Sequence, residues 1–161
     1  MSEGSTMSEG STVSAPPLLH TREQFSLIAN APFEIAWPLF GADKERAWAA
    51  DWEPAFLWPQ QAFDQEGMVF KVRQGERNAV WVNTAFDPMG RRIQYVYVIP
   101  EVVVTVITLK LTPEGHSTAV RVVYERTALA DAANELVKNM AAADRVAGKQ
   151  WERQINRYLS Q

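Results

Sequence analysis

Hydroxyl groups on predicted strands are the side chains of this sequence best suited to act on a small molecule. Tyr95 and Tyr97 stand two residues apart in a Val- and Tyr-rich stretch, so a strand there directs both phenols to one face. Thr84, Thr105 and Tyr124 fall at matching positions in neighbouring stretches of strand composition. Hydroxyl groups orient a bound molecule and polarise a carbonyl group, but they are not general acids or bases tuned near neutral pH.

The sequence lacks the residues and motifs that several other kinds of chemistry require. The sequence has no cysteine, which excludes disulfides, thiolate metal sites and a cysteine nucleophile. Two histidines, His20 near the amino terminus and His116 in a predicted turn, argue against a histidine metal site or a catalytic triad. No G-x-S-x-G elbow, phosphate loop or dinucleotide-binding glycine motif occurs. We therefore predict no catalytic residue, no metal and no cofactor, and we predict that Asp131, Glu135 and Asp144 are solvated surface charges.

A long amphipathic helix is predicted near the carboxyl end, and the strands that carry the hydroxyl groups must pack against it. Apolar residues between Leu129 and Leu159 recur mostly at steps of three, four or seven, which predicts one helix about 45 Å long. Its middle, residues 141–148, is rich in alanine and glycine. Such small residues indicate either a close approach of helix to sheet or a gap left for a ligand, and Gly148 adds a possible bend. The predicted apolar stripe consists of Leu129, Leu136, Val137, Met140, Ala143, Ala147, Trp151, Ile155 and Tyr158.

Strands precede this helix. Glu23–Ala29 alternates like a first strand, and two short helices are predicted after it, over 33–40 and 44–50. From Gly67 onward, stretches of strand composition are separated by short turn sequences, which predicts an antiparallel meander. The later strands are predicted at 56–63, 68–73, 77–86, 91–99, 102–112 and 117–127.

The register of the meander decides which side chains face the helix. Treating residues 87–90 and 113–116 as four-residue loops pairs Val82 with Tyr95 and Leu109 with Val120. One face of the sheet then carries no charged residue, and the charges gather on the other. The uncharged inner face is predicted to consist of Met68, Phe70, Val72, Val80, Val82, Thr84, Phe86, Ile93, Tyr95, Tyr97, Ile99, Val103, Thr105, Ile107, Leu109, Val120, Val122 and Tyr124.

Tryptophans contribute much of the apolar side-chain surface of this sequence. Trp48, Trp52 and Trp58 lie within eleven residues, and they either close one end of the core or line the mouth of a pocket. Trp81 is predicted on the outer face of the sheet with Val96 and Val98, where the three form an apolar surface patch or pack under the amino-terminal segment.

Composition and the amino-terminal sequence set the limits of the domain. Residues 1–6 are repeated as 7–12, and we predict that 1–20 form a tag-like or disordered leader before a ligand-binding domain at 21–161. The 161-residue chain is 47% hydrophobic and 22% charged, as expected for a globular protein, and its net charge of −3 argues against nucleic-acid binding. We predict a cytoplasmic monomer or homodimer with no stable membrane insertion.

Several local phrases occur in a fixed order: APFEIAW at 31–37, WAADWEP at 48–54, GMVF at 67–70, and Trp151-Glu152 in the predicted helix. With the order of elements, they resemble the helix-grip fold of the START-like, Bet v 1-like (SRPBCC) superfamily, of the polyketide cyclase and Hsp90-ATPase-activator type. The resemblance covers residues 22–159. It implies an α+β fold, in which a seven-stranded antiparallel curved sheet wraps around a long carboxy-terminal helix and two short helices lie between strands 1 and 2.

Three functions remain open on this evidence. The first is a binding or carrier domain whose internal hydrophobic cavity holds a small apolar or amphipathic molecule, such as a lipid, isoprenoid or polyketide-like compound. The second is a polyketide cyclase or isomerase-type enzyme, which a charged side chain inside the cavity would favour, and the third is an Hsp90-activator-like interaction domain. The predicted ligand-binding residues are Phe70, Val82, Thr84, Tyr95, Tyr97, Thr105, Ile107, Tyr124, Met140, Ala143, Ala147 and Trp151.

Overall fold

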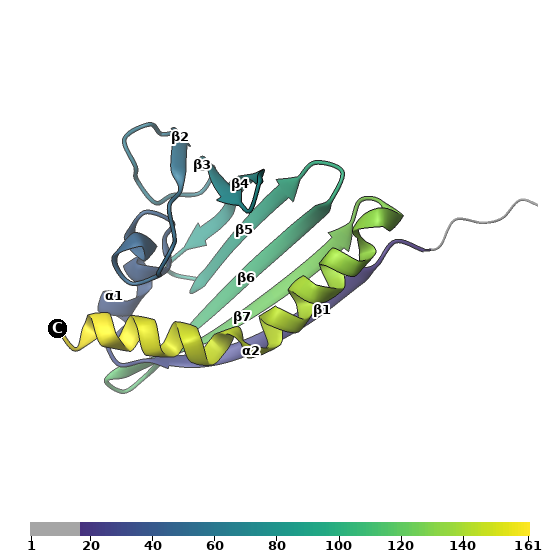
Figure 1. Cartoon of the computed structure of the whole chain (residues 1–161). Helices are drawn as coiled ribbons and strands as arrows, with labels where there is room; N and C mark the ends of the chain where they lie inside the picture. Colours follow the sequence, from purple (N-terminus) through teal and green to yellow (C-terminus); the bar gives the residue numbers. More distant parts are fainter. Residues whose placement is uncertain (1–16) are drawn as a thin grey trace, which may run out of the picture.

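A single antiparallel sheet of seven strands curves around helix α2 in the computed structural model, which describes residues 17–161 (Figure 1). The strand order is β1-β7-β6-β5-β4-β3-β2, and the predicted helix-grip architecture is confirmed. Of the predicted leader, residues 1–16 lie outside the described residues, and His20 is already the first residue of β1. The elements are β1 (His20–Ala29), α1 (Phe33–Ala36), η1 (Trp37–Phe40), η2 (Lys44–Ala47), β2 (Ala55–Trp58), β3 (Val69–Gln74), β4 (Arg77–Asp87), β5 (Arg92–Ile99), β6 (Val103–Glu114), β7 (Ser117–Ala128), η3 (Asp131–Ala133) and α2 (Asn134–Leu159).

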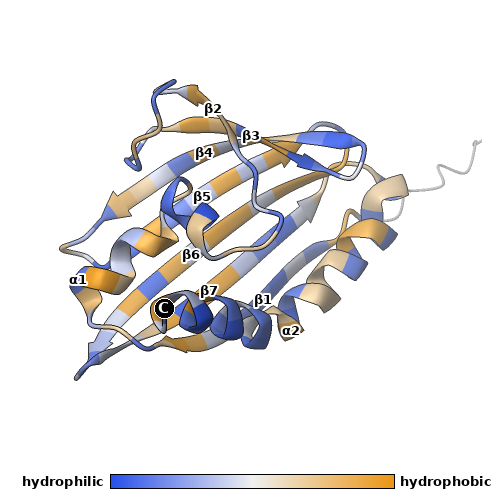
Figure 2. Ribbon diagram, turned by 60° about the vertical axis from the view of Figure 1, so that its left-hand side comes forward, coloured by the Kyte–Doolittle hydropathy of each residue, from blue (hydrophilic) through white to orange (hydrophobic). Residues whose placement is uncertain are grey.

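Helix α2 lies along the β1 side of the sheet and changes direction near its middle (Figures 1 and 2). Val137, Ala141 and Ile155 are buried against the sheet. A Cβ atom on Gly148 would lie 3.0 Å from Phe25 Cδ2 and 3.2 Å from a main-chain oxygen of β1, so the absent side chain permits close contact between helix and strand. The small residue at this position therefore serves close approach.

Part of the predicted apolar stripe of this helix is wrong. Leu129, Leu136 and Tyr158 are all more than a third exposed, and Leu129 precedes η3 and α2 in the chain. Asp144, predicted to be solvated, is instead buried on the sheet side. A hydrophobic pattern gives the average direction of a straight helix, whereas α2 follows a curved surface.

Side chains of α2 also bind the free edge of β1. Asn134 accepts a hydrogen bond from the N–H of Leu19 at 2.8 Å, and Glu152 accepts one from the N–H of Ile28 at 2.8 Å. Asn156 accepts the N–H of Asn30 and donates to the Ile28 carbonyl, both at 2.8 Å. These polar contacts satisfy main-chain groups that an edge strand otherwise leaves open.

The predicted register between β4 and β5 is wrong by one residue. Trp81, expected to face outward, lies opposite Tyr97 and points inward, and Asn83 lies opposite Tyr95. A bulge between Asn83 and Ala85 inserts one extra residue, so Phe86 still reaches the inner face as predicted. Burying Trp81 removes more apolar area from water than burying the valines beside it. Val80, Val82 and Thr84 consequently face outward, contrary to the prediction.

The hairpin between β6 and β7 differs from the prediction by two residues, which leaves the faces unchanged. Leu109 pairs with Val122 instead of Val120, because the strands continue as far as Glu114 and the turn is confined to two residues. Gly115 holds the positive φ of 63° that such a tight turn requires. The inward direction of Val120, Val122 and Tyr124 is therefore as predicted, and the next inward position along β7 is Arg126.

Candidate functional site

A pocket of about 410 Å³ lies between the inner face of the sheet, helix α2 and the segment around η2. We call it the sheet–helix pocket. Its wall combines eight aromatic side chains with aliphatic and polar ones, and four of the lining side chains are charged. The lining residues are Phe40, Glu45, Trp48, Ala49, Ala50, Asp51, Trp52, Gln74, Trp81, Tyr95, Tyr97, Ile107, Leu109, Tyr124, Arg126, Met140, Ala143, Asp144, Gln150, Trp151 and Gln154.

The predicted ligand-binding residues divide into two groups. Seven of them, all from β5, β6, β7 or α2, come together around the pocket: Tyr95, Tyr97, Ile107, Tyr124, Met140, Ala143 and Trp151. The remaining ones lie elsewhere: Phe70 is fully buried in the core, Val82 and Thr84 are on the outer face, Thr105 is fully buried beside the pocket, and Ala147 packs against the core.

Two of the clustered tryptophans help to close the pocket. The Trp48 indole N–H donates to the Leu39 carbonyl at 2.6 Å, and that of Trp52 donates to the Ala42 carbonyl at 2.8 Å. The ring centroids of Trp48 and Trp151 are 5.8 Å apart, which joins the η2 segment to α2. Both readings of this cluster hold, since Trp48 and Trp52 pack on the core and line the pocket, whereas Trp58 is 55% exposed.

A buried ion pair forms one wall of the pocket. The Arg126 guanidinium donates to both carboxylate oxygens of Asp144, from Nε at 2.7 Å and from Nη2 at 2.8 Å. Burial alone would lower the pKa of Arg126, but its hydrogen bonds with Asp144 and the nearby Tyr97 raise that pKa above the ordinary value. Arg126 therefore stays charged, and the prediction of an uncharged inner face is wrong.

Hydroxyl groups surround this ion pair. Arg126 Nη1 donates to the Tyr97 hydroxyl and, at 3.1 Å, to the Thr105 hydroxyl, while its guanidinium carbon lies 4.9 Å from the ring centroid of Tyr124. Burial raises the pKa of Tyr124 well above its usual range, and the Asp144 charge adds to the shift. The phenol of Tyr124 is therefore a neutral group.

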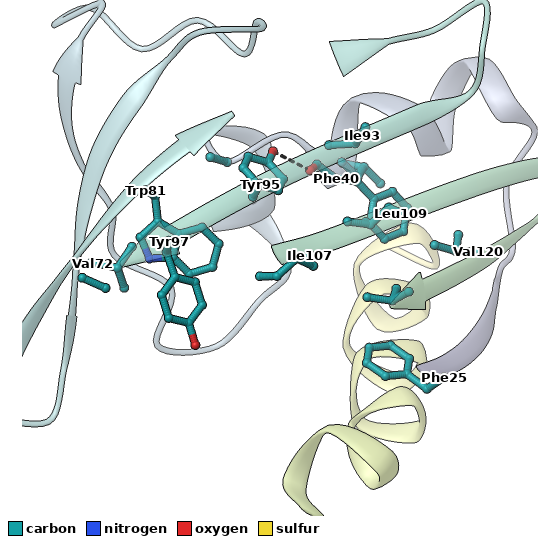
Figure 3. Close-up of a cluster of buried hydrophobic side chains, with 14 of the residues drawn as sticks. Phe25, Phe40, Val72, Trp81, Ile93, Tyr95, Tyr97, Ile107, Leu109 and Val120 are labelled. Carbon is teal, nitrogen blue, oxygen red and sulfur yellow. Dashed lines mark hydrogen bonds between the residues drawn. The ribbon is translucent and has the colours of Figure 1, made fainter. Parts of the chain in front are cut away.

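The Tyr97 hydroxyl can donate a hydrogen bond to a ligand. Its oxygen accepts a hydrogen bond from Arg126, and no group within residues 17–161 accepts a hydrogen bond from its own O–H. Tyr95 differs, because its hydroxyl donates to the Phe40 carbonyl at 3.0 Å, as Figure 3 shows. Figure 3 also shows Trp81 beside Tyr97, and their ring centroids are 4.5 Å apart. A hydroxyl that accepts a hydrogen bond from a cation becomes a stronger hydrogen-bond donor, so Tyr97 is a better donor to a ligand than Tyr95.

A carboxyl group lies on the η2 side of the pocket. Burial raises the pKa of Glu45 from 4.5 to about 8, and the neighbouring Asp64 charge contributes to the rise. Asp64 accepts hydrogen bonds from the N–H groups of Asp43, at 2.9 Å, and Lys44, at 3.3 Å, which fix it at the start of η2. Gly41 makes room for it, since a Cβ there would clash with the Asp64 carboxylate.

None of the four charged pocket residues, Glu45, Asp51, Arg126 and Asp144, was predicted from the sequence. Arg126 stands two residues after Tyr124, so continuing the alternation of β7 by one step would have placed it on the inner face. Asp144 stands four residues after Met140 on α2, which places the two on one helical face. Glu45 gives no comparable signal, because a short 3₁₀ segment in a connecting region has no periodicity to read.

Residues 17–161 contain neither a membrane-spanning helix nor a metal-binding cluster. Between residues 17 and 161 there is no helix with the length and apolar character needed to cross a membrane. That part of the chain also has no cluster of three or more His, Asp or Glu side chains arranged to hold a metal ion.

Solved structures share the fold at low sequence identity. Norcoclaurine synthase from Thalictrum flavum, in complex with dopamine and hydroxybenzaldehyde, is 11% identical with a TM-score of 0.66, covering 99% of this chain and 97% of that one. The Mll3558 protein from Rhizobium loti is 15% identical with a TM-score of 0.57, covering 89% and 99%. DynU16, a protein of the dynemicin biosynthetic locus, is 14% identical with a TM-score of 0.58, covering 86% of this chain and 47% of that one.

These likenesses establish a fold shared with Bet v 1-like proteins, among them a synthase crystallised with small aromatic molecules. No protein-family model and no curated protein matches the chain. What the pocket does must therefore be argued from its own side chains.

Proposed function

We propose that the protein binds a small, uncharged, largely aromatic molecule in the sheet–helix pocket, with a carbonyl or hydroxyl oxygen of that molecule accepting a hydrogen bond from Tyr97. The observation that carries the proposal is the free O–H of Tyr97, held beside Arg126 in a pocket lined by several aromatic rings. This is a binding or carrier function with one directional polar contact.

The size of the pocket supports a compact ligand. About 410 Å³ falls within the roughly 300–1,000 Å³ of small-molecule sites. Aromatic rings line several sides, and they pair favourably with the face or edge of another ring. Among the ligand classes that the sequence left open, polyketide-like or other ring compounds therefore fit better than long-chain lipids.

The charges support an uncharged ligand. Arg126 and Asp144 neutralise one another through two hydrogen bonds, and the remaining Arg126 donors serve mainly Tyr97 and Thr105. A ligand carboxylate or ammonium group would have to break this pair to gain an ionic partner, and separating a buried pair costs about 3–5 kcal/mol. A neutral oxygen can instead use the Tyr97 proton without disturbing the pair.

Two matched probes test the proposal. 2-Acetylnaphthalene and 2-ethylnaphthalene have nearly the same shape, but only the ketone accepts a hydrogen bond. Quenching of tryptophan fluorescence should give a tighter dissociation constant for the ketone, and Tyr97→Phe should remove the preference, a change of roughly 3–10-fold. Equal affinity of the unsubstituted protein for both probes would contradict the contact with Tyr97.

Tyr95→Phe is the matched control. The Tyr95 hydroxyl is engaged by the Phe40 carbonyl, so its removal should lower stability while leaving the preference for the ketone intact. Native mass spectrometry of the purified protein, before and after organic extraction, would then identify the class of any molecule that co-purifies.

Catalysis is a second candidate function. The observation that favours it is a carboxyl group in the pocket wall, Glu45, whose pKa is raised close to neutral pH. A non-enzymatic carrier has no need of such a group.

A further inference from the structure

Glu45 faces the pocket from an element of its own. It lies on η2, next to Trp48, and both side chains line the pocket. Its charge acts on phenols from two different strands, because it contributes to the raised pKa of Tyr95 on β5 and of Tyr124 on β7. Glu45 is therefore within electrostatic reach of the opposite wall, where the space for a ligand lies.

A second carboxyl group, that of Asp64, is held close to Glu45. Asp64, from the segment before β3, is fixed by the N–H groups of Asp43 and Lys44 and lies over Gly41. The other ionisable groups lining the pocket are Asp51, the phenols of Tyr95, Tyr97 and Tyr124, and the mutually neutralised Arg126–Asp144 pair. Asp64 is the nearby charge that most directly opposes ionisation of Glu45.

We propose that Glu45 is a general base and acid in this pocket, and that the protein catalyses proton transfer at a carbon atom next to the carbonyl group of its ligand. The inference rests on the proposed function, since the ligand must first place its carbonyl oxygen at Tyr97. Glu45 and Tyr97 line the same pocket from different elements, so one can act on the carbon atom while the other holds the oxygen.

The step is balanced without a co-reactant. The Glu45 carboxylate removes a proton from the carbon, the C–H electron pair forms a carbon–carbon double bond, and the carbonyl π pair moves onto the oxygen. The Tyr97 hydroxyl stabilises that negative oxygen by a hydrogen bond. Glu45 then returns the same proton to another carbon of the conjugated system, and the net reaction is an isomerisation of an unsaturated ketone.

The chemistry can be tested without knowing the natural ligand. 5-Nitrobenzisoxazole is a small aromatic probe from which a base removes a ring proton while its N–O bond breaks, giving a coloured phenolate. The unsubstituted protein should convert it with a rate that rises with pH around an apparent pKa near 8. Glu45→Gln should lower kcat/KM by at least about 100-fold.

Three further variants sharpen the result. Glu135→Gln removes an exposed carboxylate of α2 and should leave the rate unchanged. Glu45→Asp keeps a carboxylate on a shorter side chain and should recover part of the activity lost in Glu45→Gln. Asp64→Asn removes the opposing charge and should move the pH profile to lower pH, a shift that a purely structural role for Glu45 does not produce.

The outcomes separate this inference from the proposed function. If 2-acetylnaphthalene binds with its Tyr97-dependent preference but Glu45→Gln keeps the full rate, general-base catalysis is overturned and ligand binding stands. If the ketone preference is absent while the probe reaction depends on Glu45, the proposed contact with Tyr97 fails and the base is retained. A pH profile centred near 4.5 would also contradict the inference, because it would place the base in water.

Discussion

Arg126 of β7 and Asp144 of α2 face one another through two parallel hydrogen bonds, 2.7 Å and 2.8 Å long, with side chains that are 7% and 9% exposed. The pair joins the bend region of the helix to the inner face of the sheet. It also holds the Tyr97 hydroxyl, so a structural contact and the polar end of the pocket depend on the same guanidinium group.

Removing one member of this pair should be strongly destabilising. Asp144→Ala leaves the Arg126 charge buried without its partner, and we expect the free energy of unfolding to fall by about 3–5 kcal/mol. Urea denaturation followed by circular dichroism measures this difference. Glu23→Gln is the control, because it breaks the 2.9 Å contact with Arg145, whose side chain is 62% exposed, and should cost about 1 kcal/mol or less. Similar losses in both variants would contradict the assigned burial.

Stability should fall as pH rises through the range in which Glu45 ionises. A carboxyl group with a raised pKa in the folded state keeps its proton while the same group in the unfolded chain has lost it, so folding becomes less favourable between pH 4.5 and about 8. Glu45→Gln removes this penalty. We expect the variant to gain on the order of 2 kcal/mol over the unsubstituted protein between pH 5 and pH 8, measured by urea denaturation. A pH-independent difference would show that Glu45 is solvated.

The register of β4 predicts opposite results for neighbouring residues. Trp81→Ala empties a space inside the sheet and removes the ring stacked on Tyr97, so it should cost about 3–5 kcal/mol of unfolding free energy. Val80→Ala, at an outward position that is 37% exposed, should cost about 1 kcal/mol or less. If the valine were the more sensitive of the two, the inward and outward faces of β4 would have to be exchanged.

Gly148→Ala should lower stability although alanine favours helices. Alanine gains about 1 kcal/mol in helix propensity over glycine. The new Cβ would approach Phe25 to 3.0 Å and the Ser26 carbonyl oxygen to 3.2 Å, and a main-chain oxygen cannot move aside easily. We expect a net loss of about 1–3 kcal/mol in thermal or urea unfolding. Ala142→Gly, at an exposed position on the same helix, gives the scale of propensity alone, and a stabilised Gly148→Ala protein would rule out the close contact.

The sequence was sufficient for the order and type of the elements. Alternation along β5, β6 and β7 directed Tyr95, Ile107 and Val122 inward, as the structure has them, because long regular strands repeat every two residues. The register of β4 could not be obtained in the same way. Its bulge adds one residue at Asn83–Ala85, and nothing in the local composition marks that residue as the extra one.

The charged part of the site shows a different limit. Alternation along a strand leads one to expect every charged side chain on the solvent side. Arg126 and Asp144 are instead buried, because each provides the hydrogen-bond partner and the opposite charge for the other, 18 residues away in the sequence. Pairing of that kind is a property of the assembled fold. Glu45 is subject to the same limit, because its pKa depends on its burial in the pocket wall and on Asp64 from another segment.

The edge position of β1 also sets an order in time. This strand is made early on the ribosome, yet its partner β7 follows about a hundred residues later, as the 107-residue separation of His20 and Thr127 illustrates. At roughly 5–20 residues per second, β1 waits about 5–20 s before it can pair, and longer before α2 can cover its edge. Nascent chains that stop before Ser117 should therefore leave β1 open to protease or to a chaperone, whatever the final protein binds.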